Sequence, residues 1–323
     1  MTNPTVNSGV TQLAALRAAL WVSPDIDQAG TPTKGAWDAV SSTFYPVSGT
    51  AANLSSVAIG SSGVNGLRST AGADSQIWLG AANATGTVYE TYGNGARSIV
   101  ALVQRKSDKC IILQDQDGWS PNHGYSFSVG SDGSLNFVHQ GPSTITFVNT
   151  SANALAADEV AVVAATYDGA GVARLYKNGT QVATNSGSHG NVVWSSTDGS
   201  GRRPGLFDPN LRTGGAHEPG DGVVSAVLLY SLVLSAAEIQ TFGTTNGNAT
   251  AGQLLAVSFN GLVTAAPVIT GPNDASVTAP STANFSATVS GTYSGLRWQR
   301  QAAGAGAWAD VSGGTRSEER RVG

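Results

Sequence analysis

The sequence predicts an all-β protein, folded as a sandwich or jelly roll of short strands. Charged residues make up only 12% of the 323 residues while glycine contributes 41, and this composition suits strands joined by many turns better than long helices. Short apolar or alternating runs follow one another, and each is closed by Gly, Asn, Asp or Ser, as in residues 98–104, 125–129 and 160–167. Such regular spacing of short strands is typical of a sandwich or jelly roll.

One hairpin is predicted together with its type of turn. Asn178-Gly179 lies between the strand-like runs 173–177 and 180–184. Asn-Gly supplies the two positive φ angles of a type I′ turn, whose twist matches that of the flanking strands. We therefore expect two antiparallel strands joined by these two residues.

Two short helices are also predicted. Ser235 and Glu238 have the spacing of a capping box, in which each residue bonds the amide of the other, so a helix is expected directly after Ser235. The apolar run 223–230 before it predicts a buried strand. Near the N-terminus, leucines recur at helical spacing in residues 9–22, so residues 1–22 are expected to form a helical lead-in.

Charge and composition exclude several classes of function. The formal net charge is −4, without a cluster of Lys and Arg, so no nucleic-acid partner is expected, because binding to phosphates requires such a cluster. The longest apolar run, 223–234, is interrupted by serines and is too short for membrane insertion. The first residues lack the positively charged start of a secretory signal. We expect an extracellular or virion-surface protein that is released by another route.

The composition changes near residue 262, which predicts a domain boundary. A Pro- and Gly-containing stretch, 265–272, has the character of a linker. We therefore expect a large domain over residues 1–262 and a small one over 263–315. The last residues, 316–323, are rich in Arg and Glu and are interpreted as a non-native tail.

Several stretches of the first domain resemble a known family in their order and character. They are residues 20–25, 36–38, 66–78, 164–169, the turn 178–179 and residues 230–239. Together they resemble the laminin-G-like domains of the concanavalin A-like lectin and glucanase group, in the form found in bacteria and phages. The resemblance implies a concanavalin-like jelly-roll sandwich.

The sequence departs from this family at two places. Family members usually carry a Trp before the strand that contains residues 164–167, where Val160 and Ala161 stand here. They also usually carry acidic residues in the strand before the capping box, where Ser225 and Ala226 stand here. The second departure argues against a family-type acidic contact.

The single cysteine, Cys110, excludes an intrachain disulfide. It lies in an apolar run, so we expect a buried and unreactive side chain. Laminin-G domains secreted by animals often carry disulfides, and their absence here favours a microbial or viral source.

Residues from Pro267 onward resemble bacterial immunoglobulin-like domains. The resemblance implies that Trp298 is the core Trp of the third strand and that Phe285 fills the position of a disulfide Cys. The chain ends before the later strands of such a domain, so this second, smaller Ig-like β-sandwich is expected to be incomplete.

No catalytic arrangement is recognisable in the sequence. Retaining glycosidases hold two carboxyl groups about 5 Å apart, but the Glu-x-Asp-x-x-Glu strand of concanavalin-like hydrolases is missing. Asp158 and Glu159 would point to opposite faces of a strand. The chain is therefore expected not to be an enzyme, with a glycoside hydrolase as the weaker alternative.

The loop 115–124 is the strongest candidate binding site. Asp115 and Asp117 could offer oxygen ligands to calcium and Trp119 could stack on a sugar, with His123 in the same loop. Laminin-G-like domains often bind calcium near their ligand rim, so the resemblance implies calcium as a cofactor. The same loop is also compatible with a polar hairpin connection around a partly buried Trp.

A second candidate loop spans residues 214–222. It contributes His217 and Glu218 as candidate ligand-binding residues, and Asp221 as a candidate calcium ligand beside those of the first loop. A simple turn without a ligand is the alternative here.

These observations predict a non-catalytic recognition or adhesion protein that binds a glycan or a cell-surface receptor. The setting we expect is a phage virion, a phage tail or a bacterial surface, with other virion or surface proteins as partners. A purely structural virion decoration protein is the alternative hypothesis.

Overall fold

The computed structural model describes most of the first 243 residues and short strand segments beyond them. The described residues are 3, 5–6, 10–49, 54–59, 64–70, 75–81, 88–89, 95–116, 124–140, 145–186, 204–207, 220–243, 259–260, 268–270, 283–284, 288–290, 299–300, 309–310 and 321–322. The chain divides into two compact units, Met1–Val263 and Thr264–Gly323, and each is described by itself.

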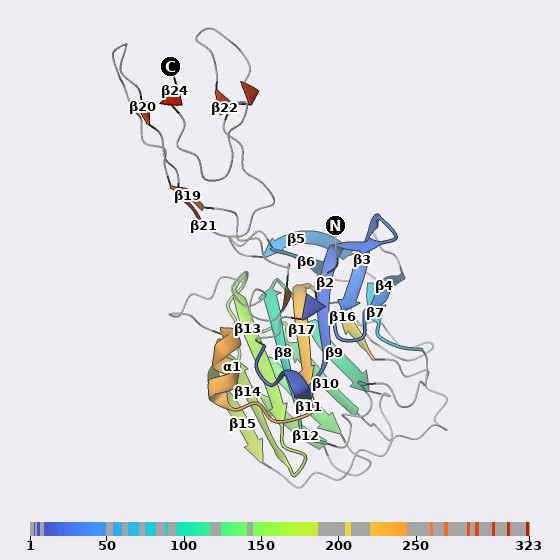
Figure 1. Cartoon of the computed structure of the whole chain (residues 1–323). Helices are drawn as coiled ribbons and strands as arrows, with labels where there is room; N and C mark the ends of the chain where they lie inside the picture. The colour runs from blue at the N-terminus through green and yellow to red at the C-terminus, as the bar shows by residue number, and fades with distance from the viewer. Residues whose placement is uncertain are drawn as a thin grey trace. The chain divides into compact units, whose positions relative to one another are not determined.

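Strands dominate the first unit (Figure 1), which confirms the predicted all-β, concanavalin-like class. Its helical elements are a 3-10 turn, Leu13–Ala15, and α1, Ala236–Gly243. The strands are β1 Thr5–Val6, β2 Leu16–Gln28, β3 Thr31–Asp38, β4 Thr43–Gly49, β5 Leu54–Ile59, β6 Val64–Ser69, β7 Ser75–Trp78, β8 Arg97–Arg105, β9 Cys110–Gln116, β10 Gly124–Val129, β11 Leu135–Gln140, β12 Ile145–Asn149, β13 Val160–Tyr167, β14 Val172–Lys177, β15 Thr180–Ser186, β16 Gly205–Phe207, β17 Gly222–Tyr230 and β18 Phe259–Asn260.

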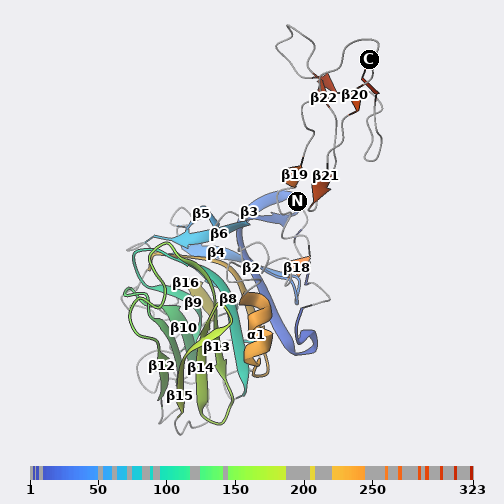
Figure 2. The same ribbon diagram turned by 90° about the vertical axis from the view of Figure 1, so that its left-hand side faces the viewer.

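The strands form two stacked layers that β4 joins. One layer runs in the order β15-β14-β13-β8-β17-β2-β3, and the other in the order β12-β11-β10-β9-β16-β7. β4 pairs with β3 of the first layer and with β7 of the second. β6 pairs with the first residues of β17 and so extends the first layer, and β5 pairs with β6. Figure 2 shows the layers from the side.

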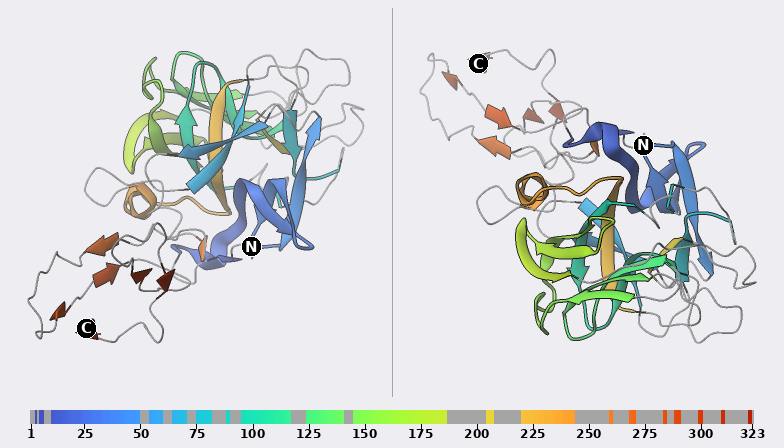
Figure 3. Two further views of the ribbon diagram at one scale, coloured as in Figure 1. Left: turned by 90° about the horizontal axis from the view of Figure 1, so that it is seen from above. Right: turned by 90° about the horizontal axis from the view of Figure 1, so that it is seen from below.

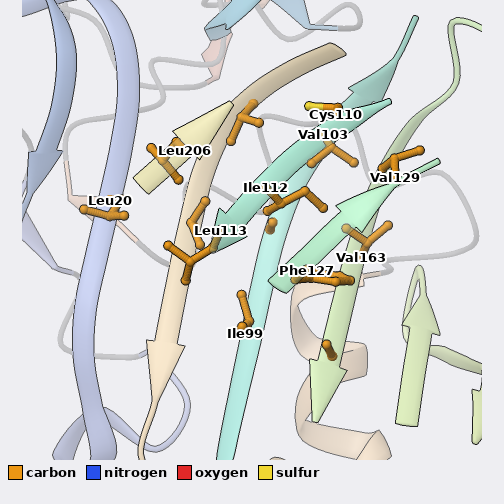
Figure 4. Close-up of a cluster of buried hydrophobic side chains, with 14 of the residues drawn as sticks. Leu20, Ile99, Val103, Cys110, Ile112, Leu113, Phe127, Val129, Val163 and Leu206 are labelled. Carbon is orange, nitrogen blue, oxygen red and sulfur yellow. The ribbon is translucent and has the colours of Figure 1, made fainter. Parts of the chain in front are cut away.

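The main hydrophobic core lies between the two layers. Alternate residues of facing strands supply it, such as Ile99 and Val103 of β8 against Ile112 of β9 and Phe127 of β10 (Figure 4). A second buried cluster covers the outer face of the first layer and includes Tyr230, Ile239 and Phe242. α1 supplies the last two, and the end-on views of Figure 3 show this helix beside the strands of that layer.

The predicted helical lead-in is wrong. A single 3-10 turn precedes β2, and β2 pairs along its length with β3 and β17. Ala18, Leu20 and Val22 enter the core between the layers, while the residues between them face outward. Leu13 lies in the 3-10 turn, and Leu16 and Leu20 belong to different buried clusters, so the leucines do not line one face. Pairing with two strands outweighs the local preference for helix.

The hairpin and the capping box are both confirmed. Asn178 and Gly179 have positive φ angles of 47° and 79° and join β14 to β15. At the start of α1, the Ser235 amide donates to Glu238 Oε2 at 2.7 Å, and the Glu238 amide donates to Ser235 Oγ at 3.3 Å. Among the described helices, none is long and apolar enough to span a bilayer.

The second unit contains short antiparallel pairs. They are β19 Val268–Thr270 with β21 Thr288–Ser290, β20 Ala283–Asn284 with β24 Arg321–Val322, and β22 Gln299–Arg300 with β23 Ala309–Asp310. Phe285 and Trp298 lie outside the described residues, so the Ig-like assignment stays a prediction. The interpretation of residues 316–323 as a non-native tail is likewise untested.

Candidate functional site

Five buried side chains with polar or charged groups meet between the layers at one end of the sandwich. We call them the Arg97 cluster: Arg97 of β8, Asp115 of β9, Tyr125 of β10, His139 of β11 and Tyr167 of β13. Each is at most 2% exposed. The core beside this cluster is apolar. Burying polar groups costs free energy unless neighbouring groups compensate them, so a buried polar cluster is a notable feature.

Strand register brings these residues together. Tyr125 lies opposite Asp115 on one side and opposite His139 on the other, so the three form a row across β9, β10 and β11. Arg97 lies opposite Tyr167 in the other layer. The two rows face each other across the sandwich, and each lies near the ends of its strands.

Ring contacts tie the rows to each other. The Arg97 Cζ atom lies 4.7 Å from the centre of the Tyr125 ring and 5.4 Å from that of Tyr167, both within the range of a cation–π interaction. The His139 and Tyr167 rings stack at 4.0 Å between centres, with 21° between their planes. Two of these contacts, Arg97 with Tyr125 and His139 with Tyr167, therefore join one layer to the other. The third, Arg97 with Tyr167, lies within one layer.

Burial shapes the charge of the cluster. It lowers the pKa of Arg97 to about 10, against the opposing influence of Tyr125, Tyr167 and Asp115. The guanidinium remains charged at neutral pH, so the interior of the sandwich holds a permanent cation. Burial also raises the pKa of Tyr167, and the charge of Arg97 opposes that rise.

The predicted loop 115–124 starts and ends at this cluster. Asp115 lies at the end of β9 and is buried within the cluster. Asp117, Trp119 and His123 lie in the connection from β9 to β10, outside the described residues. The sequence thus identified one member of the cluster, and its other predicted residues follow that member along the chain.

The predicted calcium ligands Asp115 and Asp221, both among the described residues, are not brought together. His217 and Glu218 lie outside the described residues. Asp221 lies beside the start of β9, because a Cβ atom on the next residue, Gly222, would overlap Cys110. Five positions of an extended strand separate Cys110 from Asp115, or about 16 Å, so Asp115 and Asp221 cannot share one calcium ion.

Asp221 is already engaged in an ion pair. Arg68 donates to its two carboxylate oxygens at 2.7 and 2.9 Å, and Ser107 Oγ donates at 2.7 Å. The bond from Arg68 is the main reason why the pKa of Asp221 is lowered to about 2. Among the described residues, no group of three or more His, Cys, Asp or Glu side chains could hold a metal ion.

The residues that the sequence analysis missed are Arg97, Tyr125, His139 and Tyr167. Each stands at or near the end of a strand-like run, which is the one signal that the sequence offers. Their meeting depends on strand register and on the stacking of two layers, which a single sequence does not specify.

These features define a two-layer β-sandwich with a cluster of buried polar side chains at one end. A family model described as the concanavalin A-like lectin/glucanases superfamily matches residues 99–240. The match extends from β8 into α1, so this part of the first unit is similar to that superfamily. No curated protein matches the chain.

The solved structures that the chain matches include enzymes and binding domains. Trypanosoma rangeli sialidase in complex with sialic acid is 18% identical, with a TM-score of 0.46, and the match covers 71% of this chain and 32% of that one. The binding domain of botulinum neurotoxin DC in complex with SialylT is 14% identical, with a TM-score of 0.48, and the match covers 70% and 50%. The chain thus spans about a third to a half of the proteins it matches.

The prediction that the chain is not an enzyme is corrected by this comparison. Sialidases, which are enzymes, are among the solved structures that the chain matches. The absence of the Glu-x-Asp-x-x-Glu strand argues only against the hydrolases that use this motif. It does not argue against other kinds of catalysis.

Proposed function

We propose that the first unit recognises a glycan, with a glycan-bearing surface receptor as its natural target, through the end of the sandwich above the Arg97 cluster. The observation that carries this proposal is the position of the cluster. Its residues stand at the strand ends from which residues 117–123 and 141–144 continue. Binding residues are found most often on connections that a rigid scaffold positions.

The cluster supports this role as a set of positioning residues. Contacts between Arg97, Tyr125, Tyr167 and His139 fix the ends of β8, β10, β11 and β13 relative to one another. The connection 117–123 begins and ends within this fixed frame. Trp119 and His123 are the residues that we expect to contact a sugar, the first by stacking.

The match to the lectin and glucanase family supports a glycan over other ligands. The expected setting on a phage particle or a bacterial surface, with other surface proteins as partners, rests on the sequence resemblance alone. Calcium receives no support from the described residues, because Asp115 lies near the cationic Arg97 and Asp221 is bound to Arg68.

A glycan array with and without calcium tests the proposal. We expect binding that Trp119→Ala abolishes, while Trp308→Ala in the second unit leaves it unchanged. Product analysis of every bound glycan shows whether the protein also cleaves it. An array without any bound glycan would reject the proposal and favour the structural decoration protein, for which stable assembly on particles is the expected property.

A further inference from the structure

We propose that the outer face of β2, β3 and β4 is a stacking platform for a neutral, cellulose- or chitin-like polysaccharide chain. The platform consists of Trp21, Trp37 and Phe44. It goes beyond the proposed function, because it is a second saccharide site built on a sheet face and not on the connections above the Arg97 cluster.

Register places the three rings in one row. Trp21 of β2 lies directly opposite Trp37 of β3, and Trp37 lies directly opposite Phe44 of β4. Residues that lie directly opposite each other on adjacent strands share one face of the sheet. Neighbouring strands are about 4.8 Å apart, so the row extends over about 10 Å.

The row faces away from the core between the layers. In β2, Leu20 and Val22 belong to that core, so Trp21 between them points to the opposite face. Trp21 touches the second buried cluster at its edge, whereas Trp37 and Phe44 belong to neither buried cluster. All three side chains are partly exposed.

The surroundings of the row are small and uncharged. Ala19 of β2 and Ala39, the residue after β3, stand two positions from Trp21 and Trp37 and pack in or against the second buried cluster. Gly35 stands two positions before Trp37 in β3. A Cβ atom at Gly35 would overlap the Phe44 ring, so that ring lies against the bare backbone of Gly35. The nearest neighbours of the rings along β2 and β3 are therefore small side chains without charge.

The turn between β3 and β4 fixes the row. Asp38 Oδ1 accepts from the amides of Ala19 at 2.9 Å and Val40 at 3.0 Å. Its Oδ2 accepts from Ser41 Oγ at 2.6 Å. Asp38 therefore ties β2 to β3 and closes the turn, which holds Trp37 and Phe44 in register. Rings that are held before binding lose little conformational freedom on binding.

The chemistry of this surface selects one class of occupant. Sugars whose hydroxyls are all equatorial present C–H groups on both ring faces, and these faces stack on aromatic rings. Chains of glucose or N-acetylglucosamine have this property and are flat and neutral, like the platform. An acidic polysaccharide would call for Lys or Arg in the row, and none of the three positions carries one.

Depletion assays with microcrystalline cellulose and chitin, and calorimetry with their soluble hexasaccharides, test the platform on the full chain. Trp37→Leu and Phe44→Leu keep apolar volume but remove the ring. Loss of one aromatic contact of about 1.4 kcal/mol corresponds to roughly tenfold weaker binding, so we expect about tenfold from each. Phe147→Leu is the matched control, because it changes a 46% exposed ring on β12 and should have no effect.

Two further measurements make the outcome decisive. Thermal unfolding of each variant must match the original protein, so that lost binding reports the ring and not the fold. Trp119→Ala separates this site from the one above the Arg97 cluster and should leave cellulose and chitin binding intact. The platform is rejected if neither polysaccharide binds, if both leucine variants bind normally, or if they change self-association instead, and the glycan array result stands in each case.

Discussion

At the scale of single residues, Asp221 was predicted as a calcium ligand but forms a structural ion pair with Arg68. Its carboxylate is 6% exposed and receives bonds from Arg68 and Ser107. These bonds favour the charged form, so the pKa of Asp221 falls to about 2 from an ordinary value near 4. The glycine-rich loop around Asp221 suggested a metal ligand, but the partner of its carboxylate is Arg68, which lies far away in the sequence.

Acid should therefore weaken the fold through this residue. A carboxylate with a lowered folded-state pKa stabilises the protein above about pH 4, and that stabilisation is lost as the pH falls toward 2. Asp221→Asn should cost about 1 to 2 kcal/mol at pH 7 and flatten the loss of stability below pH 4. Chemical denaturation across this range measures both effects.

The control for this prediction is Asp158→Asn. Asp158 also forms an ion pair, with Lys106, but its side chain is 74% exposed, so solvent screens the interaction. We expect little change in stability from this substitution. Equal effects of the two substitutions would contradict the assignment of Asp221.

Cys110 allows a second prediction at this scale. Its thiol is buried, and burial raises its pKa to about 12. Because the thiolate is the reactive form, native protein at pH 8 should not react with iodoacetamide within an hour. Denatured protein should react fully, and mass spectrometry distinguishes the two. Rapid alkylation of the native protein would show that β9 opens readily at its start.

At the scale of elements, local chemistry was predictable and pairing was not. The Asn178-Gly179 turn and the capping box at Ser235 formed as predicted, because each depends on residues within a few positions of one another. The leucines of residues 9–22 predicted a helix where β2 stands. Two strands, β3 and β17, decide that outcome, and both come later in the chain.

Glycine is required at position 179 for two reasons, a positive φ angle in the turn and a close approach to α1. Gly179 needs a positive φ of 79°, and a Cβ atom there would also come within 2.7 Å of Gln240 Cα in α1. Gly179→Ala should therefore destabilise the protein through both the φ angle and the helix. Gly30→Ala is the matched control, because Gly30 has a φ of 82° and nothing within 4 Å of its Cβ position.

The difference between these two variants measures how closely the hairpin packs on α1. An alanine at positive φ costs about 1 kcal/mol, which Gly30→Ala should show. Gly179→Ala should cost at least another 1 kcal/mol, since a backbone atom of the helix must move. Thermal and chemical unfolding provide the values, and equal losses would mean that α1 yields without cost.

At the scale of the whole molecule, the candidate sites depend on distant parts of the chain. The residues of the Arg97 cluster span positions 97 to 167 and come from both layers. The aromatic row requires three strands in one register, with its rings turned away from the core. The sequence predicted a two-layer sandwich and a binding end, but not which side chains meet, because neither register nor layer stacking is encoded locally.

The Arg97 cluster should couple the two layers. Tyr167 of β13 stacks on His139 of β11 and lies beside the Arg97 guanidinium, so Tyr167→Leu removes one contact across the layers and one cation–π contact. Together these contribute about 2 kcal/mol. Tyr176→Leu, at a tyrosine that is 3% exposed in the second cluster, is the control for losing a buried ring.

The excess loss of Tyr167→Leu over Tyr176→Leu is the measure of coupling. Hydrogen exchange should then accelerate in β11 as well as in β13, although the two strands belong to different layers. Exchange that accelerates in β13 alone would mean that the layers are held by the apolar core and not by the cluster. In that case glycan binding should survive Tyr167→Leu, whereas a coupled frame predicts weaker binding, because residues 117–123 start and end at strands that the cluster fixes.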